Sequence, residues 1–173
     1  MSLPSLHREV LVRMGLHLLT LQSTEHAIRL CLQIVLPKEP IKTLDDLHSL
    51  EGRESKRTIG YFLTALRERT EIEPEFDKKL VAFLDTRNRF THNLSVIQGW
   101  NMRTEEGCRT CIEMLERWEA YANEVQNTFA GLLRAWELQS GIETRVEGSE
   151  ALITFIENDY VPKVPQVFGA KDA

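Results

Sequence analysis

The chain of 173 residues is long enough to form one domain whose hydrophobic core needs neither disulfides nor a structural metal. Its residues are 42% hydrophobic and 27% charged, as in ordinary globular proteins, which excludes an intrinsically disordered chain. The formal charge of -5 argues against non-specific binding to duplex nucleic acid, because such binding needs many lysines and arginines.

The positions of the charged residues and the number of cysteines bear on the binding partners and the cellular compartment of the protein. Basic residues gather in residues 53–89 and acidic ones from Glu105 onward, so either one face is locally basic or these charges only solvate helix exteriors. The three cysteines, an odd number, argue against a disulfide framework. No segment reads as a signal peptide or approaches the roughly 18 apolar residues of a membrane span. We therefore expect a cytoplasmic protein that does not associate with a membrane.

The first predicted helix runs from about Leu6 to Leu36 and stops before Pro37. Its apolar residues recur at helical spacing, namely Met14, Leu18, Leu21, Ile28, Leu32 and Val35. Glu25 occupies one position of this seam, so it either pairs with a cation or lies half exposed where the seam drifts. Residues 37–55 read as a connection, with one helical turn expected at Leu44–Leu50.

Two shorter helices are predicted next, from about Ser55 to Arg69 and from about Glu75 to Leu94. The apolar residues of the earlier one are Ile59, Phe62, Leu63 and Leu66. Those of the later one are Phe76, Leu80, Phe83, Phe90 and Leu94. Arg87 lies in this later seam, where packing favours an apolar side chain. Such a charge needs a carboxylate, a cleft or a subunit interface, because burial without a partner is costly.

The fourth predicted helix has the most regular pattern, with Thr104 as its expected N-cap and Gly141 at its end. Its seam residues are Cys111, Leu115, Trp118, Ala122, Val125, Phe129, Leu132 and Trp136. A short helix is expected from Ser149 to Asn158 in an otherwise weakly structured tail. The fold class predicted is therefore all-α, an up-and-down four-helix bundle over residues 1–139 followed by a C-terminal tail at 140–173.

The segment Arg87-Asn88-Arg89-Phe90-Thr91-His92, near the end of the third predicted helix, carries the candidate chemistry. At about 100° per residue, Asn88 and His92 share one face of the helix, whereas Arg87 and His92 point roughly 140° apart. One helix is therefore expected to assemble the three groups poorly. A two-fold axis beside this helix would join the arginine of one chain to the histidine of another, which favours a homodimer.

The nine residues from Asp85 to Asn93, at the end of the third helix of a four-helix protein, resemble the arginine, polar residue and histidine signature of HEPN domains (higher eukaryotes and prokaryotes nucleotide-binding). The run from Arg57 to Leu63 is also similar to segments of that family, and the resemblance covers about residues 6 to 138. It implies a homodimer whose two motifs meet in a metal-independent endoribonuclease site without a cofactor. The implied roles are those of toxins in toxin–antitoxin and phage-defence systems, with an antitoxin protein as a partner.

The chemistry of these side chains suits RNA cleavage by the 2′-hydroxyl of the RNA itself, which needs a proton acceptor, a proton donor and a cation beside the phosphate. His92 fits either proton role, because histidine titrates near neutral pH. Arg87 fits the cation role, because a guanidinium can bind two phosphate oxygens. Asn88 is expected to orient the histidine or the substrate. A Glu25–Arg87 salt bridge would either place the arginine for catalysis or hold the register of the bundle.

Arg89 and Trp100 are candidate substrate-binding residues, and Trp100 either stacks on a base or is buried in the dimer contact. The competing interpretation is a non-catalytic HEPN-like scaffold, in which Arg87 is a structural ion-pair partner and His92 a helix-end cation. The lone Cys108-Arg109-Thr110-Cys111 motif lacks the second pair that zinc needs, so no metal site is expected. The remaining histidines are expected at the surface or rim, and they are His7, His17, His26 and His48.

Overall fold

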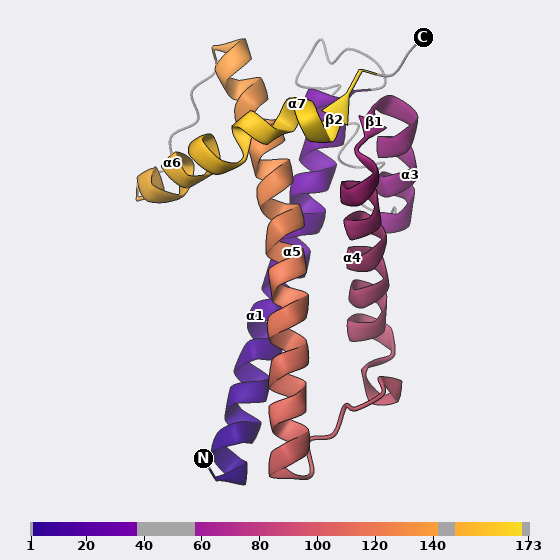
Figure 1. Cartoon of the computed structure of the whole chain (residues 1–173), viewed down its shortest axis with the longest axis vertical. Helices are drawn as coiled ribbons and strands as arrows, with labels where there is room; N and C mark the ends of the chain where they lie inside the picture. The colour runs from indigo at the N-terminus through magenta and orange to yellow at the C-terminus, as the bar shows by residue number, and fades with distance from the viewer. Residues whose placement is uncertain (1, 38–57, 142–147, 171–173) are drawn as a thin grey trace, which may run out of the picture.

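A computed structural model describes residues 2–37, 58–141 and 148–170. Two long helices, α1 (Leu3–Leu30) and α5 (Glu105–Ser140), lie side by side along most of the molecule (Figure 1). The π-helical turn η1 (Cys31–Val35) continues α1 to within one residue of the end predicted at Leu36. The described residues are predominantly helical, so the predicted all-α class is confirmed. None of the described helices combines the length and the apolar character needed to cross a membrane.

Two further helices, α3 (Ile59–Arg69) and α4 (Pro74–His92), form the other side of the molecule (Figure 1). The predicted bounds of α4 differ from the observed ones by one residue at the start and two at the end. The predicted turn at Leu44–Leu50 and the expected helix start at Ser55 lie outside the described residues. The short 3-10 turn η2 (Leu94–Val96) follows α4, so Leu94 packs on the core from beyond the helix.

The helix directions depart from simple up-and-down alternation. The hydroxyl of Thr24 lies 3.5 Å from the carbonyl oxygen of Ala122. The thiol of Cys31 lies 3.4 Å from the carbonyl oxygen of Phe129, so α1 and α5 run in the same direction. α3 also follows the direction of α1, because Arg29 lies over Phe62 and Arg69 reaches the carbonyl oxygens at the end of η1, whereas α4 runs oppositely. The expected alternation is therefore wrong between the first and second predicted helices, which run in the same direction.

The core fills the space between these helices with mainly aromatic and aliphatic side chains. The seam predicted for α4 is confirmed, since Phe76, Leu80, Phe83 and Phe90 are all buried. Six of the eight residues in the seam predicted for α5 are buried, namely Cys111, Leu115, Ala122, Val125, Phe129 and Leu132, whereas Trp118 and Trp136 are half-buried. The seam predicted for α1 is partly wrong: Leu18 is 41% exposed, and His17 and Thr24 are buried in its place.

Both ends of α5 follow the prediction. The hydroxyl of Thr104 accepts a hydrogen bond from the backbone N–H of Gly107 at 3.0 Å, which satisfies one of the free donors at the helix start. Gly141 ends the helix with a φ of 66°, a left-handed conformation that glycine adopts without a steric penalty.

The C-terminal tail crosses the upper part of the molecule (Figure 1) as α6 (Glu150–Asp159), η3 (Val161–Lys163) and α7 (Val164–Val167). α6 confirms the short helix predicted at Ser149–Asn158 within one residue. The tail ends in strand β2 (Phe168–Gly169), which pairs antiparallel with β1 (Glu71–Ile72) just before α4. Phe168 enters the core and contacts two other phenylalanine rings, so the tail packs as part of the same body.

Candidate functional site

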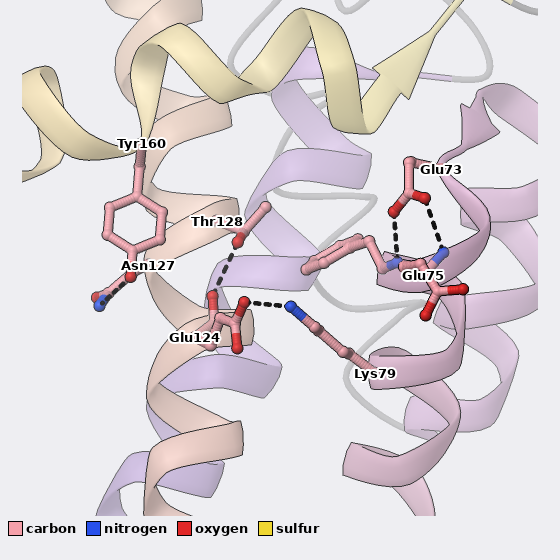
Figure 2. A network of polar contacts seen from close by, with 8 residues as sticks. Glu73, Glu75, Lys79, Glu124, Asn127, Thr128 and Tyr160 are labelled. Atoms are coloured by element: carbon pink, nitrogen blue, oxygen red, sulfur yellow. Dashed lines mark hydrogen bonds and ion pairs between the residues drawn. The ribbon is translucent and has the colours of Figure 1, made fainter.

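The candidate site lies at the C-terminal end of α4, so the anchoring of that helix decides its geometry. Pro74 begins α4, where its missing N–H costs nothing. The carboxylate of Glu73 accepts hydrogen bonds from the backbone N–H groups of Glu75 at 2.9 Å and Phe76 at 2.7 Å (Figure 2). These two bonds lower the pKa of Glu73, because they favour its charged form. The carboxylate of Glu73 therefore caps the N-terminus of α4.

A polar network then fastens α4 to α5 and the tail (Figure 2). The ammonium of Lys79 pairs with the carboxylate of Glu124 on α5. The backbone carbonyl of Glu124 accepts a hydrogen bond from the hydroxyl of Thr128 at 2.8 Å, and the Asn127 amide donates to the Tyr160 hydroxyl at 3.4 Å. These contacts hold α4, α5 and the tail together on the side of α4 that is far from its C-terminal end.

An ion pair between Arg87 and α1 fixes the position of the candidate motif. Its Nε donates a hydrogen bond of 2.7 Å to Oε1 of Glu25. The two side chains retain 24% and 16% of their exposure, so the pair is largely shielded from water. The predicted Glu25–Arg87 salt bridge is therefore present, and it fixes the guanidinium through Nε and leaves the two terminal nitrogens for other partners.

The guanidinium of Arg87 also contacts the other two residues of the motif. Its Nη1 donates to Oδ1 of Asn88 at 3.2 Å and lies 3.4 Å from Nε2 of His92. The expectation that one helix would keep Arg87 and His92 apart is therefore wrong. The angle of about 140° describes only where the side chains leave the helix, and the long arginine side chain reaches around the last turn. All three groups meet within one chain.

Access to the site differs between its members. Asn88 and His92 are exposed, whereas Arg87 is half-buried behind them. The tail contacts the opposite end of α4, where the carbonyl of Val167 accepts a hydrogen bond from the N–H of Glu73 at 2.9 Å. The motif therefore offers an anion a carboxamide and an imidazole at the surface, with a guanidinium in contact with both. A phosphate that bound Nη1 would release Nε2 of His92 to accept a proton.

A buried histidine lies beneath the motif. His17 has no exposed surface and packs edge-on against the Phe90 ring at 4.8 Å, with Trp118 at 6.0 Å on another side. Both ring nitrogens lack a hydrogen-bond partner among the described residues. Burial lowers the pKa of His17 to about 4, so the ring is neutral near pH 7. The expectation that His17 lies at the surface or rim is therefore wrong, because its position belongs to the core seam of α1.

The two candidate substrate-binding residues have partners in the same chain. Arg89 forms an exposed ion pair with Asp85 at 2.9 Å, four residues earlier on α4. Trp100 stacks parallel to Trp118, with ring centroids 6.3 Å apart and planes 1° from parallel. One face of the Trp100 indole is thus occupied by the core of its own protomer, and only the remaining surface is open to a base or to a second chain.

The cysteine motif takes no part in the site. Cys108 and Cys111 are buried near the start of α5, and burial raises the pKa of Cys111, which disfavours its thiolate. Within residues 2–37, 58–141 and 148–170, no three histidine, cysteine or carboxylate side chains gather in a geometry that would hold a metal ion.

The sequence pattern pointed to Glu25, Arg87, Asn88 and His92, and the structure brings these four side chains into one group of contacts. The pattern did not place His17 in the core. The one sequence signal for the burial of His17 is its position seven residues from both Val10 and Thr24, which are also buried in this seam. No protein-family model matches this chain, and neither a curated protein nor a solved structure matches it.

Proposed function

We propose that this protein is a metal-independent endoribonuclease of HEPN type, with a HEPN-like helical bundle and RNA as its substrate. The observation that carries the proposal is the contact of Arg87 with both Asn88 and His92 at an exposed helix end. Cleavage by a 2′-hydroxyl needs proton transfer and a cation beside the phosphate, and the imidazole of His92 and the guanidinium of Arg87 supply these at one surface point. The resemblance of residues 85–93 to the HEPN signature supports the same reaction.

Each residue has a distinct role in this mechanism. His92 accepts the proton of the 2′-hydroxyl, or donates one to the leaving 5′-oxygen. Arg87 stabilises the charge that develops on the phosphate. Asn88 donates its amide to the substrate while its carbonyl oxygen holds the guanidinium. Glu25 is a positioning residue, since it binds Nε of Arg87 and so directs the terminal nitrogens toward the surface.

Two partners belong to this proposal. A second copy of the chain would make a homodimer, and an antitoxin protein would restrain the enzyme in a toxin–antitoxin or phage-defence system. The divergence of Arg87 and His92 no longer argues for the homodimer, because the two side chains meet within one protomer.

The alternative is a non-catalytic HEPN-like scaffold that uses Arg87 only as a structural charge. The Arg87–Glu25 pair favours this alternative, since it would stabilise α4 against α1 with or without a substrate. The exposure of Asn88 and His92, and the position of the tail at the far end of α4, favour the enzyme. A structural arginine needs no imidazole beside it at the surface.

The test compares cleavage of structured and single-stranded RNA by the wild type and by Arg87→Ala and His92→Ala. Each substitution should lower the cleavage rate by about a hundredfold or more while circular dichroism stays unchanged. Arg109→Ala and His26→Ala, which remove an exposed arginine and an exposed histidine elsewhere, are matched controls and should cleave normally. Wild-type protein that cleaves none of these RNAs, or a His92→Ala variant with full activity, would favour the scaffold.

A further inference from the structure

Helix α1 carries a second apolar surface besides the one that enters the core. Five large apolar residues near its middle are 41% to 61% exposed, and they are Leu11, Val12, Leu16, Leu18 and Leu19. Gly15 lies among them, and a Cβ atom at Gly15 would meet nothing within 4 Å. We call these six residues the α1 stripe. In Figure 1, α1 runs along α5 at one edge of the molecule.

The α1 stripe points away from the core. At about 100° per residue, its members cover roughly 160° of the helix circumference, and the centre of that arc lies about 180° from the buried seam. The seam consists of Leu6, Val10, His17, Leu21, Thr24 and Ile28. A surface helix of a monomer normally places polar residues on the face opposite its core seam. Between residues 11 and 19 that face is apolar, as in a covered surface, and the polar residues Arg8 and Gln22 flank it on the same side of the helix.

The order of residues along the α1 stripe is nearly symmetric about Gly15. Leu11 and Leu19 are each four residues from Gly15, and Val12 and Leu18 are each three residues from it. A two-fold axis through Gly15, perpendicular to the helix, would therefore lay apolar residues of one copy on apolar residues of a second, antiparallel copy. An interface between identical chains must be self-complementary in this way. The bare backbone at Gly15 would let the two helices approach closely at the crossing point.

We propose that the α1 stripe is the contact surface for a second copy of this chain, packed antiparallel about Gly15. The exposed parts of the five apolar side chains amount to roughly 400 Å² in one patch, which is within the range of the largest apolar patch on a typical monomer, a patch that is often functional. This is about half of the roughly 800 Å² that each partner contributes to a stable interface, and the polar residues flanking the stripe would supply the rest. No charged residue lies within the stripe, so the two copies bring no like charges together at the centre.

This pairing leaves each candidate site within its own protomer. Glu25, which holds Arg87, lies ten residues from Gly15, or about 15 Å along α1. The two-fold axis places the equivalent residue of the second copy equally far in the opposite direction, so the two sites are about 30 Å apart. The inference does not depend on nuclease activity, since it rests on the α1 stripe alone.

The first arm of the test measures molar mass by light scattering over a wide range of protein concentrations. The wild type should approach twice the monomer mass of 20.0 kDa. The double variant Leu16→Lys/Leu19→Lys should stay monomeric with unchanged circular dichroism, because both positions are exposed in one protomer. Leu138→Lys is the matched control, since Leu138 is 53% exposed on α5 outside the stripe, and it should dimerise like the wild type. A monomeric wild type, or a double variant that still dimerises, would overturn the proposal.

The second arm tests the antiparallel geometry by oxidative cross-linking. Leu11→Cys and Leu19→Cys are made separately, and the native cysteines do not compete because all three are buried. A mixture of the two variants should form disulfide-linked dimers much faster than either variant alone, because residue 11 of one copy faces residue 19 of the other. Faster cross-linking within Leu11→Cys alone would indicate a parallel pair and would overturn the proposed two-fold axis.

Discussion

Arg87 donates a hydrogen bond of 2.7 Å from Nε to the carboxylate of Glu25, a residue 62 positions earlier in the chain. The bond joins the end of α4 to α1, whereas the start of α4 is joined to α5 through Lys79 and Glu124. α4 is therefore tied to one long helix near each end. The same bond that fixes the helix also orients the guanidinium toward Asn88 and His92, so structure and chemistry depend on one pair of side chains.

Replacement of Glu25 by alanine should lower the free energy of unfolding by about 1–2 kcal/mol, because the half-buried guanidinium loses its charged partner. The full cost of a buried charge is not expected, since both side chains keep some contact with water. Urea unfolding of Glu25→Ala, Arg87→Ala and the double variant measures the coupling between the two residues. Additive losses would show that the ion pair contributes nothing to stability.

Replacement of Arg87 by lysine should abolish most RNA cleavage although the charge is retained. The single ammonium of lysine cannot bind Glu25 through one nitrogen and present a second nitrogen to Asn88 and a phosphate. Glu25→Gln should be milder, because a glutamine amide still accepts the hydrogen bond from Nε. Rates of RNA cleavage, with circular dichroism as the folding control, check this order. Equal activity of Arg87→Lys and the wild type would mean that only the charge matters.

Periodicity together with Pro74, Thr104 and Gly141 predicted α4 and α5 closely, because each has apolar residues on one side and polar residues on the other. It failed on α1, where leucines occur on nearly every face and Leu18 is as apolar as the truly buried Leu21. The choice of His17 and Thr24 for the core depends on packing against Phe90, Trp118 and Ala122, which no spacing rule contains.

The candidate site was predicted residue by residue, but its assembly was not. A helical projection records where a side chain begins, and arginine is long enough to place its guanidinium far from that direction. The contact between Arg87 and His92 also depends on α4 ending at His92, so that the last turn is uncovered. A sequence pattern locates a helix end only to within one or two residues, so it cannot predict a contact that depends on the exact last residue of the helix.

His17 should make the protein less stable as the pH falls from about 6.5 to about 4. Its pKa is lowered to about 4 in the folded chain, so the unfolded chain binds more protons across this range. The loss attributable to His17 is at most about 1.4 kcal/mol per pH unit, or about 3 kcal/mol in total. His17→Leu removes the two unpaired nitrogens and should be as stable as the wild type, or more stable, at pH 7. Urea unfolding of both proteins at each pH isolates the effect, and parallel curves would refute it.

Subunits that carry different site substitutions should not restore each other's activity. The site of one protomer already contains Arg87, Asn88 and His92, so a mixture of Arg87→Ala and His92→Ala chains gives no protomer with a complete set. The measurement is RNA cleavage after the two variants are unfolded, mixed and refolded together. A refolded mixture of wild type with either variant is the control for recovery. Substantial activity from the two mixed variants would place the arginine and the histidine of one site on different chains.

Cleavage should survive EDTA and leave a 2′,3′-cyclic phosphate on the 5′ fragment. In the proposed mechanism the nucleophile is the 2′-hydroxyl beside the scissile phosphate, and its proton passes to His92 while Arg87 stabilises the phosphate charge. The bond that forms joins the 2′-oxygen to phosphorus, and the bond that breaks releases the 5′-oxygen of the next nucleotide. That leaving oxygen takes a proton from protonated His92 or from water. The cyclic product therefore follows from the identity of the nucleophile. Mass spectrometry of the fragments identifies this end, and an RNA with a 2′-deoxy substitution at the cleavage position is the matched substrate control, which should not be cut there. Fragments with a 5′-phosphate and a free 3′-hydroxyl, or activity that EDTA removes and magnesium restores, would instead require a metal-activated water, which the contacts of Arg87, Asn88 and His92 do not provide.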